Sequence, residues 1–511
     1  MLCRNFQTCA ALIAALLLLP GLATAQPQPP SWPTKQWPGS TPEEQGMDSN
    51  ALAALVDFGA ANAMDSLVVT RHGHIVAEAY YAPFKPGMRH RLNSATKGVL
   101  AALTGIAISQ GKLSDTDRPM VEFFPERNIS KLDQGKKSIT LQHLLDMQSG
   151  LDWIEPLSDV VPESVNAMRR SADWLQFVLD RPMAKGPGAG FNYNSGNSHL
   201  LGAILTRQTG VPLKDFASEH LFQPLGILDV RWQRDPQGIY TGGFGLYLQS
   251  RDMAKLGYLY LRGGEWDGAQ ILPRNWVGKV FAARLPMTIS ATADWRYGDQ
   301  WWTLPERDAY MAVGYNRQII LVMPRTGVVA ALTGRRNYPF EAMLGLVARA
   351  VKADVPLAAN PQGVALLERR SREVALEQAV TFPSPALAQQ ISGKTWRVAP
   401  NPFGVTAFTL HLGASASYQI ERYLERGSRL TRTESYPLGQ DGLFSAGDTV
   451  DGSAVVSRLR WTGPNTLTVV ARRPGEAETD SYELQFFGNR VAIRHTNSFG
   501  ATANLAGEAG E

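Results

Sequence analysis

The sequence contains very little cysteine, and all of it lies at one end. Among 511 residues there are two cysteines, Cys3 and Cys9, both within the first 25 residues. The remaining chain therefore has no thiol, no disulfide and no cysteine metal site. Its stability must come from hydrophobic cores, and 511 residues exceed what one core usually organises, so we expect two domains.

The chain also lacks a strong charge imbalance and a membrane-spanning run. The formal net charge is +4, without a basic stripe, which excludes nucleic acid and a charged membrane surface as partners. The longest apolar run, AALIAALLLLPGL, is shorter than the roughly 20 residues that a bilayer requires. It follows Arg4 and precedes Ala23-Thr24-Ala25, the pattern of a secretory signal. We expect a cleaved signal peptide over residues 1–25, and a periplasmic or secreted protein without stable membrane insertion.

Two common catalytic patterns are missing as well. The sequence has no G-x-S-x-G elbow and no H-E-x-x-H zinc pattern. His72 and His74 have a spacing that suits metal ligation, but no third ligand is near them in sequence, and a hairpin tip explains both. We therefore expect neither a metal nor a cofactor.

Helical and strand patterns occupy separate blocks, which is typical of an α+β fold. An extended lead-in over residues 26–45 ends with a helix expected to begin near Pro42, capped by Ser40 or Thr41. Residues 66–81 and 316–334 predict hairpins, the second around the turn Pro324–Gly327. Further helices are expected over residues 94–110, 139–149 and 341–352. We predict that these elements form a first domain over residues 46–358.

The sequence pattern changes beyond roughly Asn360. A charged helical linker is expected over residues 359–384, followed by short alternating strands. Phe408, Leu410 and Leu412 fall on one face at a period of two. We expect residues 385–505 to form a separate antiparallel β domain, either a barrel or a sandwich.

Ser94 and Lys97 form the strongest candidate for chemistry. On a helix, residues three apart share a face, so the Lys97 amine would lie within hydrogen-bond reach of the Ser94 hydroxyl. A lysine buried among Val99, Leu100 and Leu103 can lose enough basicity to take the serine proton. The helix N-terminus also favours a developing alkoxide. Alone, S-x-x-K is common by chance, and an ordinary first helical turn with a solvated lysine is the alternative.

Four ordered segments carry a family resemblance. Ser94-x-x-Lys97 is followed by ITLQHLLDMQSGLDW (Ile139–Trp153), PGAGFNYNSGNSHLLGAIL (Pro187–Leu205) and GGFGLYLQSRDMAKLGYLYL (Gly242–Leu261). Together they resemble the serine β-lactamase and penicillin-binding protein superfamily. Within it, the resemblance is to the class C β-lactamase-like serine hydrolases of the esterase and 6-aminohexanoate-dimer hydrolase branch. It covers roughly residues 40 to 355.

The resemblance implies a fold and three catalytic residues. The expected core is an antiparallel sheet flanked by helices, with an all-helical subdomain. Ser94 would be the acylated nucleophile, Lys97 its base, and Tyr193 a shuttle that carries the proton to the leaving group. We expect nearby Lys97 to lower the pKa of Tyr193 for this work.

Other site residues follow from the same segments, with departures from the family pattern. Ser195 stands where the family has an asparagine, so Asn194 or Asn197 are alternatives for the substrate contact. Arg325-Thr326-Gly327 imitates the family's third motif but reads as a turn, and Ala312–Gln318 matches better. There the backbone N–H of Tyr315 would join that of Ser94 in an oxyanion hole. The remaining predicted substrate-binding residues are Gly314, Asn316, Asp152 and Trp153.

Two further stretches have less definite roles. His143 lies in a helix that the family uses structurally, so a core role is expected. The aromatic cluster DWRYGDQWW (Asp294–Trp302) either lines a pocket or belongs to the core.

Taken together, the sequence predicts an exported serine hydrolase that acts on small ester or amide substrates through a Ser94 acyl-enzyme and needs no cofactor. The absence of the usual lysine or histidine in the third motif disfavours the first alternative, a β-lactamase or D-amino-acid peptidase. The second alternative is an inactive hydrolase core in a protein that binds a cell-wall-related ligand.

Overall fold

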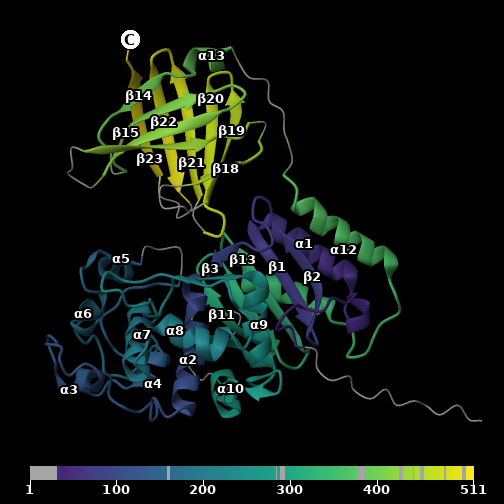
Figure 1. Cartoon of the computed structure of the whole chain (residues 1–511), viewed down its shortest axis with the longest axis vertical. Coiled ribbons are helices and arrows are strands. Elements are labelled where there is room, and N and C mark those ends of the chain that lie inside the picture. The colour runs from purple at the N-terminus through teal and green to yellow at the C-terminus, as the bar shows by residue number, and fades with distance from the viewer. Residues whose placement is uncertain are drawn as a thin grey trace, which may run out of the picture. The chain divides into compact units, whose positions relative to one another are not determined.

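The computed structural model describes residues 32–157, 162–282, 285–287, 294–377, 379, 386–401, 403–424, 430–440, 442–448, 454–476, 479–497 and 502–510. The signal peptide predicted over residues 1–25 lies outside these described residues. The α-helices of the described residues, labelled in Figure 1 except for α11, are α1 (Ser49–Ala61), α2 (Thr96–Ser109), α3 (Gln134–Lys137), α4 (Leu141–Leu145), α5 (Glu163–Arg170), α6 (Trp174–Leu179), α7 (Ser195–Thr209), α8 (Leu213–Ala217), α9 (Ser250–Leu261), α10 (Arg274–Phe281), α11 (Phe340–Ala350), α12 (Pro361–Val374) and α13 (Leu387–Ile391).

An eight-stranded antiparallel sheet forms the centre of the first domain, in the order β2-β1-β13-β12-β11-β10-β9-β8. The two predicted hairpins are present as β1–β2 and β12–β13. They pair through β1 and β13, with Leu67 opposite Leu332, so the sheet joins segments that lie far apart in the sequence. Its strands are β1 (Met64–Arg71), β2 (His74–Tyr80), β8 (Leu285–Pro286), β9 (Arg296–Gly298), β10 (Trp301–Leu304), β11 (Ala309–Gly314), β12 (Gln318–Met323) and β13 (Val328–Gly334).

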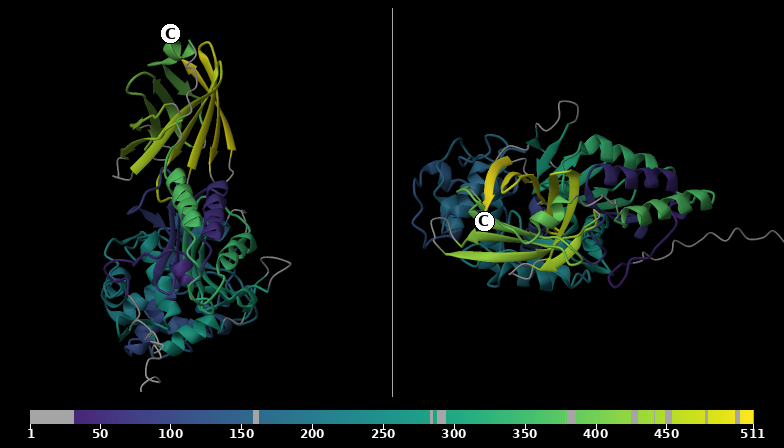
Figure 2. Two further views of the ribbon diagram at one scale, coloured as in Figure 1. Left: turned by 90° about the vertical axis from the view of Figure 1, so that its right-hand side faces the viewer. Right: turned by 90° about the horizontal axis from the view of Figure 1, so that it is seen from above.

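The two faces of this sheet belong to two different hydrophobic cores. Leu67 and Val69 pack in one core with residues of α1 and α11, whereas Val68 between them packs in the other. Helix α9 contacts β1, β12 and β13, while α12 lies beside α1 (Figures 1 and 2). Because successive side chains of a strand point to opposite faces, strands covered on both sides are apolar throughout, and their sequences show no alternation.

Helix α7 lies at the centre of the helical part of the first domain. Helix α7 contacts α2, α4, α6 and α8, and every residue from Ser195 to Leu205 is buried. The expected architecture, an antiparallel sheet flanked by helices plus an all-helical subdomain, is therefore confirmed. Outside this subdomain, short strands β3 (Arg89–Arg91), β4 (Arg231–Trp232) and β5 (Leu246–Gln249) form a three-stranded sheet, and β6 (Glu265–Trp266) and β7 (Ala269–Gln270) form a hairpin.

Two predicted helix boundaries were wrong for reasons of backbone conformation. The helix expected near Pro42 is only a 3-10 turn over Glu43–Gln45, because Gly46 adopts a left-handed conformation that ends it. Helix α1 begins at Ser49 instead, where the Asp48 side chain accepts a hydrogen bond from the Asn50 amide. Helix α4 is shorter than predicted, since Met147 is left-handed with φ 57°.

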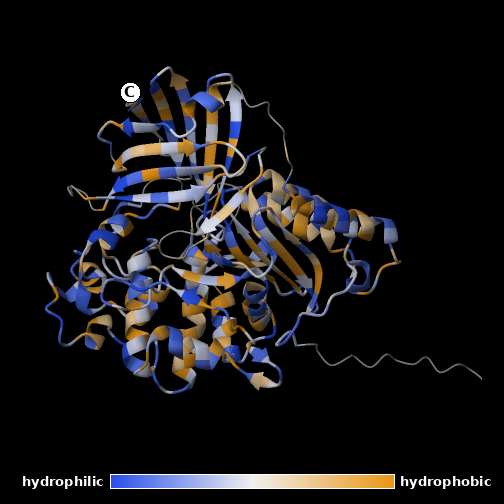
Figure 3. Ribbon diagram, turned by 45° about the horizontal axis from the view of Figure 1, so that its top comes forward, coloured by the Kyte–Doolittle hydropathy of each residue, from blue (hydrophilic) through white to orange (hydrophobic). Residues whose placement is uncertain are grey.

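The residues after 385 form an antiparallel β domain, as predicted. Ten strands follow the order β17-β16-β15-β14-β23-β22-β21-β20-β19-β18, and β17 contacts β18, so the sheet curls back on itself as a barrel does. Along β22 exposed and buried residues alternate, and the strands of this domain are banded blue and orange in Figure 3. The strands are β14 (Thr395–Val398), β15 (Val405–His411), β16 (Ser417–Tyr423), β17 (Thr431–Pro437), β18 (Ser445–Asp448), β19 (Ala454–Gly463), β20 (Thr466–Arg472), β21 (Thr479–Phe487), β22 (Arg490–Asn497) and β23 (Thr502–Ala509).

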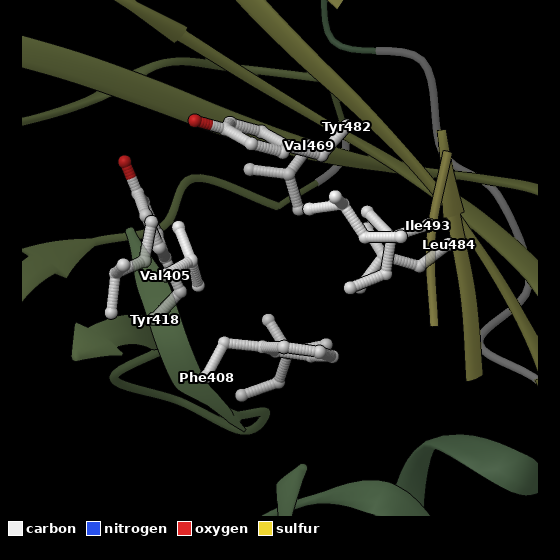
Figure 4. A pocket seen from close by; sticks show the side chains of 10 residues that line it. Val405, Phe408, Tyr418, Val469, Tyr482, Leu484 and Ile493 are labelled. Carbon is white, nitrogen blue, oxygen red and sulfur yellow. The ribbon is translucent and has the colours of Figure 1, made fainter. Parts of the chain in front are cut away.

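The curled sheet contains a small apolar cavity of about 50 Å³. Tyr418 and Tyr482 border it, with their hydroxyl groups pointing away from Ile493 and Leu484 (Figure 4). Such a lining buries apolar groups but supplies neither a nucleophile nor a base. Its lining residues are Val405, Phe408, Leu410, Tyr418, Ile420, Val469, Tyr482, Leu484, Ile493 and Leu505.

Candidate active site

Ser94 lies at the junction between a strand and a helix. It is in the 3-10 turn Asn93–Ala95, which follows β3 and continues directly into α2. The helix predicted to contain Ser94 thus begins two residues later, at Thr96, and Ser94 stays half-buried at its N-terminal end. The preceding residue, Asn93, has φ 48°, and its side chain donates a hydrogen bond to the Tyr315 carbonyl at 3.2 Å. The hydroxyl is therefore held at the end of α2 where the helix dipole is positive.

Lys97 projects from the first turn of α2 toward Ser94 and is 1 % exposed. Its Nζ donates hydrogen bonds to Ser94 Oγ at 3.0 Å, Ser195 Oγ at 3.0 Å and the Gly243 carbonyl oxygen at 2.8 Å. All three acceptors lack a formal charge, so they compensate the ammonium group poorly. Burial lowers the pKa of Lys97 to about 8, while the charge of Glu155 acts in the opposite direction. At pH 7 roughly a tenth of this amine is therefore neutral, far more than for a lysine with the ordinary pKa of 10.5.

The contact with Gly243 depends on a close approach between two segments. Gly242 and Gly243 pass directly over the start of α7, and a Cβ added at Gly242 would lie 1.9 Å from the Ser198 carbonyl oxygen. At Gly243 it would lie 2.9 Å from the Ser195 carbonyl oxygen. The Gly-Gly pair noted in the sequence thus allows a backbone carbonyl to reach the buried amine.

Tyr193 immediately precedes α7 and faces the same amine. Lys97 Nζ lies 4.8 Å from the centre of the Tyr193 ring, which is 6 % exposed. The expectation that Lys97 lowers the pKa of Tyr193 was wrong. Burial and the negative charge of Glu155 raise that pKa, and the hydrogen bond with Ser94, which lowers it, is the smaller effect. The phenol therefore stays protonated and is available as a hydrogen-bond and proton donor.

Ser195, which replaces the family's asparagine, connects Lys97 to a carboxylate that the sequence analysis missed. Glu155 accepts hydrogen bonds from Ser195 Oγ at 2.6 Å, from the Ser195 amide at 2.7 Å and from Trp153 Nε1 at 2.8 Å. Glu155 lies in a loop, where no periodic pattern indicates the direction of a side chain. The only signal is its position two residues after the Ser-Gly-Leu-Asp-Trp stretch.

The predicted oxyanion-hole segment lies against the Ser94 turn. Strand β11 ends at Gly314, where an added Cβ would lie 2.1 Å from the Leu92 carbonyl oxygen and 3.1 Å from the Ala95 amide nitrogen. Only glycine permits this approach. The turn that follows has Asn316 at φ 59° and Arg317 at φ 64°, and Gln318 Nε2 donates to the Tyr315 carbonyl at 3.0 Å. The segment is thus tied to the turn that carries Ser94.

Four other residues predicted to bind substrate are either engaged by other side chains or buried. Asp152 forms an ion pair with Arg181 at 2.7 Å, and Trp153 is 4 % exposed with its indole N–H on Glu155. Asn197 and Asn316 are both buried. The structure therefore brings together Ser94, Lys97, Tyr193 and Ser195, with Trp153 connected through Glu155, whereas the Asp152 side chain is engaged by Arg181.

The aromatic cluster Asp294–Trp302 is mostly core. Trp295, Tyr297, Trp301 and Trp302 are all buried. Tyr297 alone of these four has a ring contact with the site, at 6.3 Å from the Tyr193 ring in an edge arrangement. His143, predicted to be structural, accepts a hydrogen bond from the Thr140 amide in a capping box.

The described residues provide neither a metal-binding cluster nor a membrane-spanning helix. Among the residues that the structure describes, no group of three or more His, Cys, Asp or Glu side chains is arranged to hold a metal ion. In that same portion no helix has both the length and the apolar character to cross a bilayer. His72 and His74 lie at the β1–β2 turn, where His72 Nδ1 is 3.2 Å from Gln45 Oε1.

Comparison with known proteins gives consistent matches over the first domain. The family model described as Beta-lactamase matches residues 50–354. The chain is 29 % identical over 352 residues to the 6-aminohexanoate-dimer hydrolase of Paenarthrobacter ureafaciens, covering 61 % of this chain and 88 % of that protein. It is 27 % identical over 212 residues to Esterase EstB of Burkholderia gladioli, covering 37 % and 53 % respectively.

A solved structure gives the same result for the fold. The protein is from Bacillus anthracis and is provisionally described as a 6-aminohexanoate-dimer hydrolase. It superimposes with a TM-score of 0.53 at 21 % identity, over 62 % of this chain and 86 % of that one.

Proposed function

The chain belongs to the Beta-lactamase family, whose fold it shares, and from that premise we propose that it is an exported serine hydrolase of small ester or amide substrates. The observation that carries the proposal is the position of the Lys97 amine, 3.0 Å from Ser94 Oγ and almost completely buried. Burial lowers the pKa of Lys97 to about 8, so the amine can accept a proton near neutral pH.

In the first step, neutral Lys97 removes the Ser94 proton as Oγ attacks the substrate carbonyl carbon. The bond between Oγ and that carbon forms, and the carbonyl oxygen becomes an oxyanion. The backbone N–H groups of Ser94 and Tyr315 are the proposed donors to this oxyanion. Their contribution is greatest where the charge develops, in a site shielded from water.

In the second step, the tetrahedral intermediate breaks down to the acyl-enzyme. Tyr193 donates its phenolic proton to the leaving oxygen or nitrogen, and protonated Lys97 restores that proton to the phenol. A protonated phenol suits this role, and burial, which raises the pKa of Tyr193, keeps it protonated. Water then attacks the acyl-enzyme by the reverse sequence, with Lys97 accepting the water proton and returning it to Ser94.

Small ester and amide substrates are favoured by the relatives' names and by the third motif. The Paenarthrobacter protein is named a 6-aminohexanoate-dimer hydrolase and the Burkholderia protein an esterase. At the family's third motif, Lys- or His-x-Gly, this chain has Ala312-Val313-Gly314, so alanine stands in place of the lysine or histidine that would attract a substrate carboxylate. A β-lactamase or D-amino-acid peptidase would need that cation, so we rank these activities second.

The test compares the wild type with Ser94→Ala on p-nitrophenyl esters, the linear 6-aminohexanoate dimer and nitrocefin. We expect ester or amide hydrolysis by the wild type, slower or no nitrocefin turnover, and at least a thousandfold loss, on the order seen when a nucleophile is removed, in Ser94→Ala. Ser138→Ala, which changes an exposed serine, is the matched control.

Intact-mass measurement after treatment with a fluorophosphonate probe completes the test. One adduct is expected on the wild type and on Ser138→Ala, and none on Ser94→Ala. A folded wild type that gains no adduct and hydrolyses none of the substrates would contradict the proposal and favour a binding protein with an inactive hydrolase core.

Export is the remaining part of the proposal. It is supported by Arg4, the apolar run and the Ala-Thr-Ala sequence within residues 1–25. Expression in a Gram-negative host, followed by fractionation and N-terminal sequencing, should give a periplasmic or secreted protein that begins near Gln26. A cytoplasmic, uncleaved product would overturn it.

A further inference from the structure

Glu155 has a position in the site that the mechanism above does not use. We propose that it is a positioning residue: by accepting a hydrogen bond from the Ser195 hydroxyl, Glu155 orients the lone pair of the Lys97 amine toward Ser94. This inference rests on the proposed function, because it concerns the base of that reaction.

Three donors converge on the two oxygen atoms of the Glu155 carboxylate. Ser195 Oγ donates to Oε1 at 2.6 Å, while the Ser195 amide and the Trp153 indole N–H donate to Oε2 at 2.7 and 2.8 Å. A carboxylate only accepts hydrogen bonds, and a backbone amide and an indole N–H only donate. The direction of all three hydrogen bonds is therefore determined.

This direction determines what Ser195 offers to Lys97. A hydroxyl has one proton, and that of Ser195 is used on Glu155, so its oxygen can only accept from Lys97 Nζ at 3.0 Å. The Gly243 carbonyl oxygen, 2.8 Å from the same nitrogen, also only accepts. A neutral amine has two protons and one lone pair. With both protons used on these acceptors, the lone pair points along the remaining contact, toward Ser94 Oγ at 3.0 Å.

Glu155 also acts on the same amine through its charge. Burial lowers the pKa of Lys97, and the negative charge of Glu155 partly offsets that effect. Positioning and charge thus make separate predictions. Loss of the charge alone would give a weaker base with a larger neutral fraction, whereas loss of the hydrogen-bond direction would misplace the lone pair.

The variant Glu155→Gln tests the positioning directly. The two N–H donors on Oε2 require the glutamine carbonyl oxygen at that place, which puts its NH2 group opposite Ser195 Oγ. The Ser195 hydroxyl must then accept from glutamine and turn its proton toward Lys97. We expect kcat/KM for p-nitrophenyl acetate to fall at least about tenfold, within the range that a general base contributes. We also expect the rising limb of its pH profile, near pH 8 in the wild type, to move to lower pH.

A second variant separates hydrogen-bond direction from charge. Ser195→Ala removes the connecting hydroxyl but keeps the carboxylate, so kcat/KM should fall without a shift of the pH profile to lower pH. In a Ser195→Ala background, Glu155→Gln should cause little further loss of activity, because no hydroxyl is left to reverse. The pH profile should still move. Glu163→Gln, at an exposed carboxylate, is the matched control and should resemble the wild type.

The outcomes distinguish this inference from the proposed function. If the wild type is labelled by fluorophosphonate and active, but Glu155→Gln keeps the wild-type activity and pH profile, only the inference is overturned. The inference alone is also overturned if Glu155→Gln reduces activity by the same factor in the wild type and in the Ser195→Ala background. If the wild type is neither labelled nor active, both proposals fall. Thermal unfolding of each variant shows whether a loss of activity reflects a loss of folding. If Glu155→Gln does not fold, Ser195→Ala decides the matter: full activity together with a wild-type pH profile in that variant overturns the inference.

Discussion

Two buried lysines in the first domain have the same local spacing and opposite surroundings. Lys97 in α2 follows Ser94 by three residues, and Lys255 in α9 follows Asp252 by three residues. Lys255 Nζ lies 3.4 Å from Asp252 Oδ1 and also donates to the Gly226 carbonyl oxygen at 2.9 Å. Burial lowers the pKa of both lysines. At Lys255 the negative charge of Asp252 acts against this, whereas the hydrogen bonds of Lys97 go to hydroxyl and carbonyl oxygens.

The difference shows that a spacing of three residues brings two side chains close together. The chemical nature of the partner then determines the role of the lysine. A carboxylate three residues earlier forms an ion pair with the amine and favours its charged form. A hydroxyl in the same place gives the ammonium group no direct counter-ion, and the more distant charge of Glu155 only partly offsets burial, so the neutral amine is favoured. We therefore expect the first arrangement to contribute to the stability of the fold, and the second to supply the proposed base at some cost in stability.

The largest expected difference is in activity. Lys97→Met should reduce kcat/KM for p-nitrophenyl acetate by about 10² to 10⁴, because the general base is lost while the buried volume is kept. Lys255→Met, the matched substitution, should retain activity within about threefold at temperatures where it is folded. Steady-state kinetics of both variants check this. Similar losses in the two variants would mean that the comparison is wrong.

The second expected difference is in stability at neutral pH. Lys255→Met should lower the free energy of unfolding by about 3 kcal/mol, because it leaves the buried Asp252 without its cation. Adding Asp252→Asn to that variant should recover part of the loss. Denaturant unfolding at pH 7.5 gives the values. If Lys255→Met is as stable as the wild type, the pair contributes nothing to the fold.

The third expected difference, similar in size to the second but seen only as pH is varied, is the pH dependence of stability at Lys97. Burial lowers the pKa of Lys97 from 10.5 to about 8, so between these values the unfolded state binds more protons, and the wild type gains stability as pH rises. Lys97→Met lacks this gain. Its stability relative to the wild type should therefore be highest at or below pH 8 and fall by about 3 kcal/mol by pH 10.5.

Denaturant unfolding of both proteins across this pH range measures the difference. Ionisable groups remote from position 97 affect both proteins alike and cancel in this difference. A difference that stays constant with pH would show that the folded-state amine has an ordinary pKa and would remove the basis for its role as a base.

The sequence predicted contacts within one element better than contacts between elements. The Ser94–Lys97 contact follows from helical spacing, and the four family segments indicated the sheet and the helical subdomain. Glu155 was missed because it lies in a loop, where no period specifies a direction. The pKa of Tyr193 was predicted in the wrong direction, because the depth of burial depends on packing from Tyr297 and α7 that no local pattern reveals. The predicted start of the first helix was wrong because the left-handed conformation of Gly46 ends the turn near Pro42, although the preceding residues suit a helix cap.

The absence of a side chain at Gly314 has a practical consequence for redesign. Any larger residue there would push the end of β11 away from the turn that carries Ser94. We therefore expect most substitutions at this position to give inactive protein. A library intended to change substrate preference would keep glycine at 314 and vary the half-buried Tyr315 beside it.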